Sequence, residues 1–187
     1  MNKVRAGFTI VELIVVIVVI GILATITMVS YDNIRSKGYD SQRISDAKSI
    51  QESIELYRIK NNAFPAVSIS GMGSQSGWES SAREAPGEFL RPLADSGYME
   101  SVPLDPINNA IESSTILAKT NQSYGYVYYR YAAGTNGCDA TRGTYYILGI
   151  INLKTSLTQP DPSSPGFSCS SRDWQPEFSW VVGAFEK

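Results

Sequence analysis

The chain has 187 residues, a formal net charge of −2 and no histidine. A nucleic-acid-binding surface needs an excess of basic side chains, so this charge balance argues against one, and the lack of histidine removes a side chain much used in metal binding and acid–base catalysis. Beyond an apolar segment near the N-terminus, the remainder has the size of a single globular domain.

That segment is a nearly continuous apolar run from Phe8 to Val29. Its polar residues are Thr9, Glu12, Thr25 and Thr27. As a helix rising about 1.5 Å per residue, the run is long enough to cross a bilayer core of about 30 Å, so we expect it to be inserted in a membrane. A carboxylate in such a segment is costly, which makes Glu12 a candidate for a functional contact.

The residues before the run differ from an ordinary secretory signal. Lys3 and Arg5 supply a basic start, but the Ala6–Gly7 step suited to cleavage comes before the apolar run rather than after it. Cleavage there would keep the apolar helix and make Phe8 the new N-terminus. Glu12 would then lie four residues from the Phe8 ammonium, in the first helical turn, where the helix dipole favours an anion.

Gly7, Phe8, Glu12 and the aliphatic residues that follow resemble the N-terminal signature of type IV pilins and pseudopilins. The resemblance implies that a prepilin peptidase cleaves after Gly7, that Phe8 is N-methylated, and that the apolar helices pack into a filament core. It also implies that Glu12 pairs with the Phe8 amine of a neighbouring subunit. The alternative is a signal anchor that carries a glutamate by accident.

The same resemblance implies a single-pass protein of the inner, cytoplasmic membrane, with its N-terminus in the cytoplasm and a globular head outside, which then joins a cell-surface or periplasmic filament. The expected partners are other copies of the chain, the prepilin peptidase and the pilus or secretion assembly machinery. One departure is Val29, at a position where many members carry a proline, so the helix kink of those members is not implied here. Gly21 interrupts the run instead.

An amphipathic pattern continues the helix beyond the membrane. Among charged residues, apolar side chains recur at three- and four-residue steps: Ile44, Ala47, Ile50, Ile54 and Tyr57. Asn61–Asn62 and Pro65 are stop signals, so we expect one helix from about Phe8 to Lys60 whose second half packs on the head.

Loops and then strands follow this helix. Residues 68–88 are rich in Gly and Ser and predict a surface loop in which Trp78 covers the core. Residues 88–96 predict a short helix limited by Pro92. Strands rich in Tyr, Val and Ile are expected at 124–132, 144–151 and 178–185, and the first two form an antiparallel pair.

These elements predict an α+β pilin fold, in which a long N-terminal helix packs on a small antiparallel sheet. The expected organisation is a leader at 1–7, a transmembrane and filament-core helix at 8–30, and an extracytoplasmic head at 31–187, made of the amphipathic helix to about 60, loops at 61–123 and an antiparallel sheet at 124–187.

Cys138 and Cys169 both lie in loop-like sequence and fit a single disulfide in an oxidising compartment. A metal-binding pair or a catalytic thiol is the alternative, although the chain has no CxxC spacing. No cofactor is expected. Some pseudopilins bind calcium in their C-terminal loops, and Asp161 and Asp173 would be the oxygen donors, but no spaced ligand motif is present and solvated loop acids are the simpler interpretation.

Two classes of function remain after these observations. The first is a structural, non-enzymatic subunit that polymerises through the N-terminal helix, with a minor tip subunit acting as an adhesin or sensor as its variant. The second is a membrane-tethered binding domain or enzyme, against which stands the lack of GxSxG and P-loop patterns. Glu12 distinguishes the two classes, because a membrane tether does not need this glutamate.

A second resemblance covers the head in outline. Leu56–Tyr57, Phe64–Pro65 and the segment 102–106 (Val-Pro-Leu-Asp-Pro) followed by a Tyr-rich strand resemble the order of elements in the major pseudopilins of type II secretion. The C-terminal cysteine pair resembles instead the disulfide-closed loop of many type IV pilins. Secretion pseudopilus and pilus therefore both stay open at this point.

Overall fold

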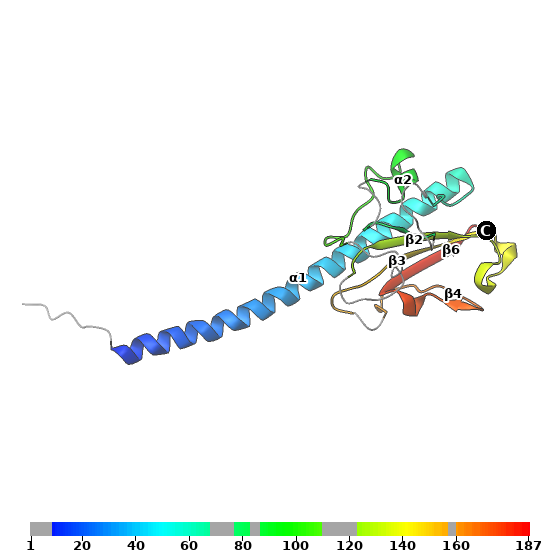
Figure 1. The fold of residues 1–187 in the computed structure, drawn as a ribbon. Helices are drawn as coiled ribbons and strands as arrows, with labels where there is room; N and C mark the ends of the chain where they lie inside the picture. The colour runs from blue at the N-terminus through cyan, green and yellow to red at the C-terminus, as the bar shows by residue number, and fades with distance from the viewer. Residues whose placement is uncertain (1–8, 68–76, 83–86, 110–122, 157–159) are drawn as a thin grey trace, which may run out of the picture. The chain divides into compact units, whose positions relative to one another are not determined.

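The computed structural model describes residues 9–67, 77–82, 87–109, 123–156 and 160–187 (Figure 1). The chain divides into two compact units, Met1–Gly38 and Tyr39–Lys187. The predicted leader, with Gly7 and the Phe8 that would follow the cut, lies outside the described residues. The predicted head began at residue 31, whereas the second compact unit begins at Tyr39.

One helix, α1 (Ile10–Asn61), contributes to both units. Its 52 residues contain no proline, and the backbone stays helical through Gly21, Val29 and Gly38. The helix ends where the sequence predicts, because Asn62 takes a left-handed conformation with φ of 52°, which asparagine tolerates better than most residues.

In the first unit, α1 presents the apolar run on all sides. Its large side chains from Ile10 to Met28 are 48–78% exposed. Within the described residues, α1 is the one helix long and apolar enough to cross a membrane. A helix that is apolar all round needs lipid or other helices as its surroundings, which agrees with the predicted membrane span.

The second unit holds a four-stranded antiparallel sheet in the order β1-β2-β3-β6. Figure 1 labels β2, β3 and β6 of this sheet. Its strands are β1 (Glu79–Ser80), β2 (Tyr126–Tyr131), β3 (Tyr145–Ile150) and β6 (Trp180–Phe185). Tyr126 pairs with Ile150 across β2 and β3, and Tyr145 pairs with Phe185 across β3 and β6. The three predicted strands are thus present, and the predicted α+β pilin architecture is confirmed.

Side chains pack on both faces of the sheet. Successive residues of each strand point to opposite faces, so each strand contributes to both layers. Tyr126 and Tyr128 pack with Ile50 and Ile54 of α1 in one apolar cluster. Val127 and Tyr131 pack with a second, aromatic-rich cluster on the other face. That second cluster includes Trp78, Tyr145, Trp174, Phe178 and Val181.

Trp78 is 3% exposed and packs against Tyr129 and Phe178, so it covers the aromatic cluster as expected. The surface-loop prediction for residues 68–88 nevertheless missed β1, which pairs Glu79 with Tyr128. Much of that loop, at 68–76 and 83–86, lies outside the described residues.

The remaining elements are short. Helix α2 (Arg91–Asp95) falls inside the predicted 88–96, with Pro92 in its first turn. A two-stranded hairpin that the sequence did not predict is formed by β4 (Ser168–Cys169) and β5 (Arg172–Asp173). Single turns of 3₁₀ helix occupy Thr135–Gly137, Ala140–Arg142 and Gln175–Glu177.

Candidate functional site

The amino end of α1 holds Glu12 in a defined position. The Thr9 backbone N–H and hydroxyl both donate to Glu12 Oε2 at 2.8 Å, and the Glu12 N–H donates back to Thr9 Oγ1 at 3.2 Å. This reciprocal arrangement is a capping box, which satisfies backbone donors at a helix start. The spacing of Thr9 and Glu12 carries the signature of the box, although the sequence analysis did not use it.

Glu12 is therefore fixed within one helical turn and remains exposed on the surface of α1. A carboxylate oriented in this way can meet a cation from a neighbouring chain without first losing rotamer freedom. Its predicted partner, the amine of Phe8, lies outside the described residues, so the Glu12–Phe8 contact stays a prediction.

A buried ionic cluster lies at the start of the head. Arg43 Nε and Nη2 donate to the two carboxylate oxygens of Asp105 at 2.6 and 3.0 Å, and Arg43 Nη1 donates to Asp40 at 2.8 Å. The side chains of Arg43 and Asp105 are 0% exposed and that of Asp40 is 7% exposed. Burial lowers the pKa of Arg43, but Asp105 and Asp40 outweigh it and leave the pKa raised.

The same carboxylates bind backbone from distant parts of the head. Asp40 accepts the N–H groups of Lys154 and Thr155, each at 2.8 Å. Asp105 accepts the N–H groups of Ile107 at 2.8 Å and Asn108 at 3.2 Å. Two segments, around 105 and around 154, are thereby tied to α1. Sequence reasoning missed this cluster because Arg43 and Asp105 are 62 positions apart, and no local pattern reports such a pairing.

The predicted disulfide between Cys138 and Cys169 is present, with Cα atoms 4.9 Å apart. Both sulfur atoms take part in the bond, so neither cysteine is a free thiol in this structure. Two hydrogen bonds accompany it: Ser170 Oγ donates to the Gly137 carbonyl at 2.9 Å, and the Ser171 N–H donates to the Asn136 carbonyl at 3.2 Å. The bridge therefore joins the β2–β3 connection to the β4–β5 hairpin.

The two acids proposed as calcium donors close local turns. Asp161 accepts the N–H and hydroxyl of Ser163 at 2.8 and 2.6 Å, and Asp173 accepts the N–H of Gln175 at 3.0 Å. Across the described ranges, no group of three or more His, Cys, Asp or Glu side chains is placed to hold a metal ion.

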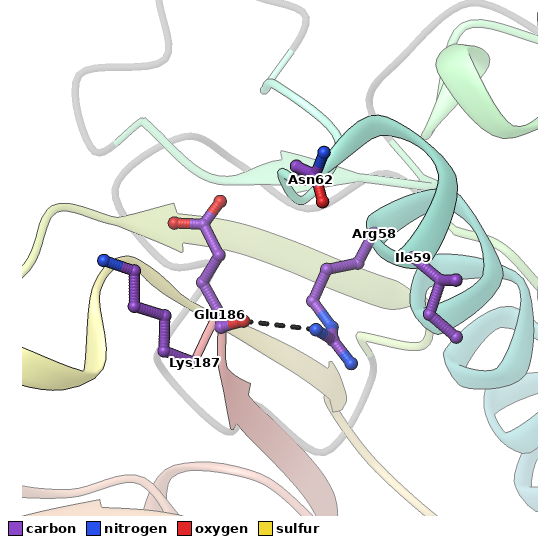
Figure 2. A pocket seen from close by; sticks show the side chains of 5 residues that line it. All are labelled: Arg58, Ile59, Asn62, Glu186 and Lys187. Carbon is purple, nitrogen blue, oxygen red and sulfur yellow. Dashed lines mark hydrogen bonds between the residues drawn. The ribbon is translucent and has the colours of Figure 1, made fainter.

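A cavity of about 430 Å³ lies where the end of α1 meets the residues after β6. It is lined by Arg58, Ile59, Asn62, Glu186 and Lys187 (Figure 2). Arg58 donates to the Glu186 carbonyl at 3.1 Å and to Glu55 at 2.9 Å. These bonds already hold the Arg58 guanidinium. We therefore interpret the residues that line the cavity as a contact surface rather than a catalytic site.

Comparison with known proteins yields two kinds of match, one to a family model of the N-terminus and one to whole relatives. Residues 2–28 match the family model described as the prokaryotic N-terminal methylation motif. The chain is 32% identical over 109 residues to the type II secretion system core protein G of Escherichia coli (strain K12), covering 56% of this chain and 68% of that protein.

Similar relatives occur in other bacteria. The chain is 29% identical over 105 residues to the type II secretion system core protein G of Aeromonas hydrophila, covering 56% of this chain and 69% of that protein. The Vibrio cholerae protein of the same name is 25% identical over 111 residues, covering 58% of this chain and 71% of that protein. No solved structure matches the chain.

Proposed function

This chain belongs to the family of type II secretion system core protein G, a family of pseudopilins, and from that premise we propose that it is a structural subunit of a secretion pseudopilus. A prepilin peptidase cleaves it between Gly7 and Phe8, Phe8 is methylated, and the mature subunit polymerises through α1. We assign it no catalytic activity, in keeping with relatives that are structural subunits.

The observation that carries the proposal is Glu12 held by Thr9 at the start of an exposed apolar helix. A membrane tether gains only a helix cap from this carboxylate, whereas a filament core gains a charge partner as well. In the filament, Glu12 meets the Phe8 ammonium of an adjacent subunit. The pair neutralises both charges and sets the axial register of the subunits.

The proposed topology follows from the same signature. The N-terminus stays in the cytoplasm, α1 crosses the inner membrane, and the head lies outside. The Cys138–Cys169 disulfide supports a head outside the cytoplasm, because disulfides persist in oxidising compartments. The assembly machinery then draws the subunit from the membrane into a periplasmic filament.

The test compares Glu12→Ala with Glu52→Ala as a matched control, since Glu52 is an exposed glutamate of the same helix within the head. Removing one partner of a buried ion pair costs about 3–5 kcal/mol because the other charge is left unpaired. Each variant is expressed as the only core subunit, together with its assembly machinery. Glu12→Ala should enter the membrane and be cleaved normally, but shearing the cells should release no filaments. Glu52→Ala should form filaments as wild type does.

Filaments of wild-type length and number from Glu12→Ala subunits would overturn the register role and favour a membrane-tethered domain. Filaments that contain this chain only at their ends would instead identify a minor tip subunit. Immunogold labelling along sheared filaments separates that outcome from a uniformly distributed core subunit.

A further inference from the structure

A short polar hairpin borders the aromatic-rich cluster of the head. Strands β4 and β5 pair over two positions only, Ser168 with Asp173 and Cys169 with Arg172, and Cys169 packs against the cluster. A two-stranded hairpin is marginally stable by itself in water. The 168–173 hairpin therefore depends on the contacts that hold it from outside.

The connection between β2 and β3 holds the hairpin at three points. The Cys138–Cys169 disulfide is one, and the hydrogen bonds of Ser170 and Ser171 described above are the other two. Ser170 and Ser171 are exposed, so water competes for both hydrogen bonds and each stabilises the contact only modestly. The disulfide is the dominant link.

Arg172 makes the hairpin a cover. Its Nε and Nη2 donate to Glu177 at 2.8 and 2.7 Å, and its Nη1 donates to the Tyr131 hydroxyl at 3.2 Å. The guanidinium carbon lies 5.0 Å from the centre of the Trp174 ring, within the range of a cation–π contact. Tyr131 and Trp174 are 8% and 0% exposed. Moving Arg172 away would open this aromatic edge to solvent.

The chain on either side of the hairpin is fixed by other bonds. Before it, the Gly166 N–H donates to the Val181 carbonyl in β6 at 3.0 Å. At its base, the Trp174 N–H donates to the Phe167 carbonyl at 3.1 Å. Because these bonds do not involve residues 168–173, the hairpin can open locally while the sheet stays folded.

We propose that the Cys138–Cys169 bond is a redox latch, whose reduction opens the 168–173 hairpin without unfolding the four-stranded sheet. A dithiol supplies the two electrons and two protons: its thiolate attacks the disulfide, the Sγ–Sγ bond breaks, both cysteines become thiols, and the dithiol is oxidised to its own disulfide. The edge at Tyr131 and Trp174 is then covered in an oxidising compartment and accessible in a reducing one. The latch needs no filament, so it is independent of the proposed function.

Limited trypsin digestion of the full chain in detergent micelles tests the latch. Trypsin cuts after arginine, and the rate of cutting follows the population of the open form. Arg172 reports on the hairpin, and Arg130 in β2 reports on the sheet. Dithiothreitol, or the double change Cys138→Ser and Cys169→Ser, should speed the cut after Arg172 by about 10-fold or more and leave the cut after Arg130 unchanged. Reoxidation of the wild-type chain should restore the slow cut.

Glu177→Gln is the matched control, because it loosens the Arg172 side chain but keeps the disulfide. In this variant the bond after Arg172 should stay resistant, and a rise equal to that on reduction would assign the protection to the ion pair and overturn the latch. Equal rates after Arg172 with and without the disulfide would also overturn it. A parallel rise in the cut after Arg130 would show that the head unfolds as a whole, and a rate that stays high after reoxidation would show that the opening is not a switch; either result contradicts the proposal.

Discussion

Replacing Arg43 with methionine removes the cation from the buried ionic cluster of the head. The change deletes three charge-assisted hydrogen bonds and leaves the Asp105 and Asp40 carboxylates buried without their cation. Breaking a buried pair by removing one partner costs about 3–5 kcal/mol. The backbone donors that remain on both carboxylates favour the lower half of that range.

For a domain of the size of residues 39–187, each kcal/mol shifts the melting temperature by about 2–4 °C, so Arg43→Met should lower it by about 6–16 °C. Near-ultraviolet circular dichroism of the full chain in detergent micelles follows this transition, because all three tryptophans belong to the head. The matched control is Arg91→Met, which removes an arginine that is 52% exposed and paired with Glu88 and Asp95 on the surface. The control should melt as wild type does.

A second change checks the cause. Adding Asp105→Asn to Arg43→Met removes one of the stranded charges, so the double variant should recover part of the lost stability. If Arg43→Met melts within a few degrees of Arg91→Met, or if Asp105→Asn adds to the loss instead of reducing it, the buried charge is not what stabilises this region.

Three further predictions concern the rest of the head. Replacing Cys138 and Cys169 with serine removes a link across 31 positions and should cost about 3–4 kcal/mol of unfolding free energy while membrane insertion continues, with free thiols on exported wild-type protein as the contrary result. Gly149→Ala places a methyl group 2.8 Å from the Phe178 ring and should cost about 1–3 kcal/mol in urea titration; an unchanged midpoint would contradict that packing. Burial raises the pKa of Tyr131 to about 12 from 10.0, so above pH 10.0 the unfolded state loses its proton first and stability should fall as pH rises toward 12. Unfolding free energies that stay level over that range would show this phenol to be accessible.

Much of the fold was predictable because it is encoded locally. The long helix follows from an apolar run joined to an amphipathic pattern and ended by Asn61–Asn62, and the main strands follow from Tyr-rich stretches. The disulfide followed from having two cysteines in an exported head. The two-residue strand β1 could not be predicted, because pairing with β2 rather than its own composition makes Glu79 part of the sheet.

Some functional residues could be recognised from the sequence, and others only from the structure. Glu12 was detectable because a carboxylate in an apolar run is anomalous by itself. Arg43 and Asp105 are ordinary charges in sequence, and their importance comes only from burial and from a pairing over 62 positions.

The most direct test of the central claim is the intact mass of this chain in purified filaments. The account predicts subunits along the filament that begin at Phe8, carry one N-terminal methyl group and retain the Cys138–Cys169 bond. Subunits that begin at Met1, or a chain found only in the membrane while filaments form without it, would contradict the claim that this protein is a processed and polymerising pseudopilin.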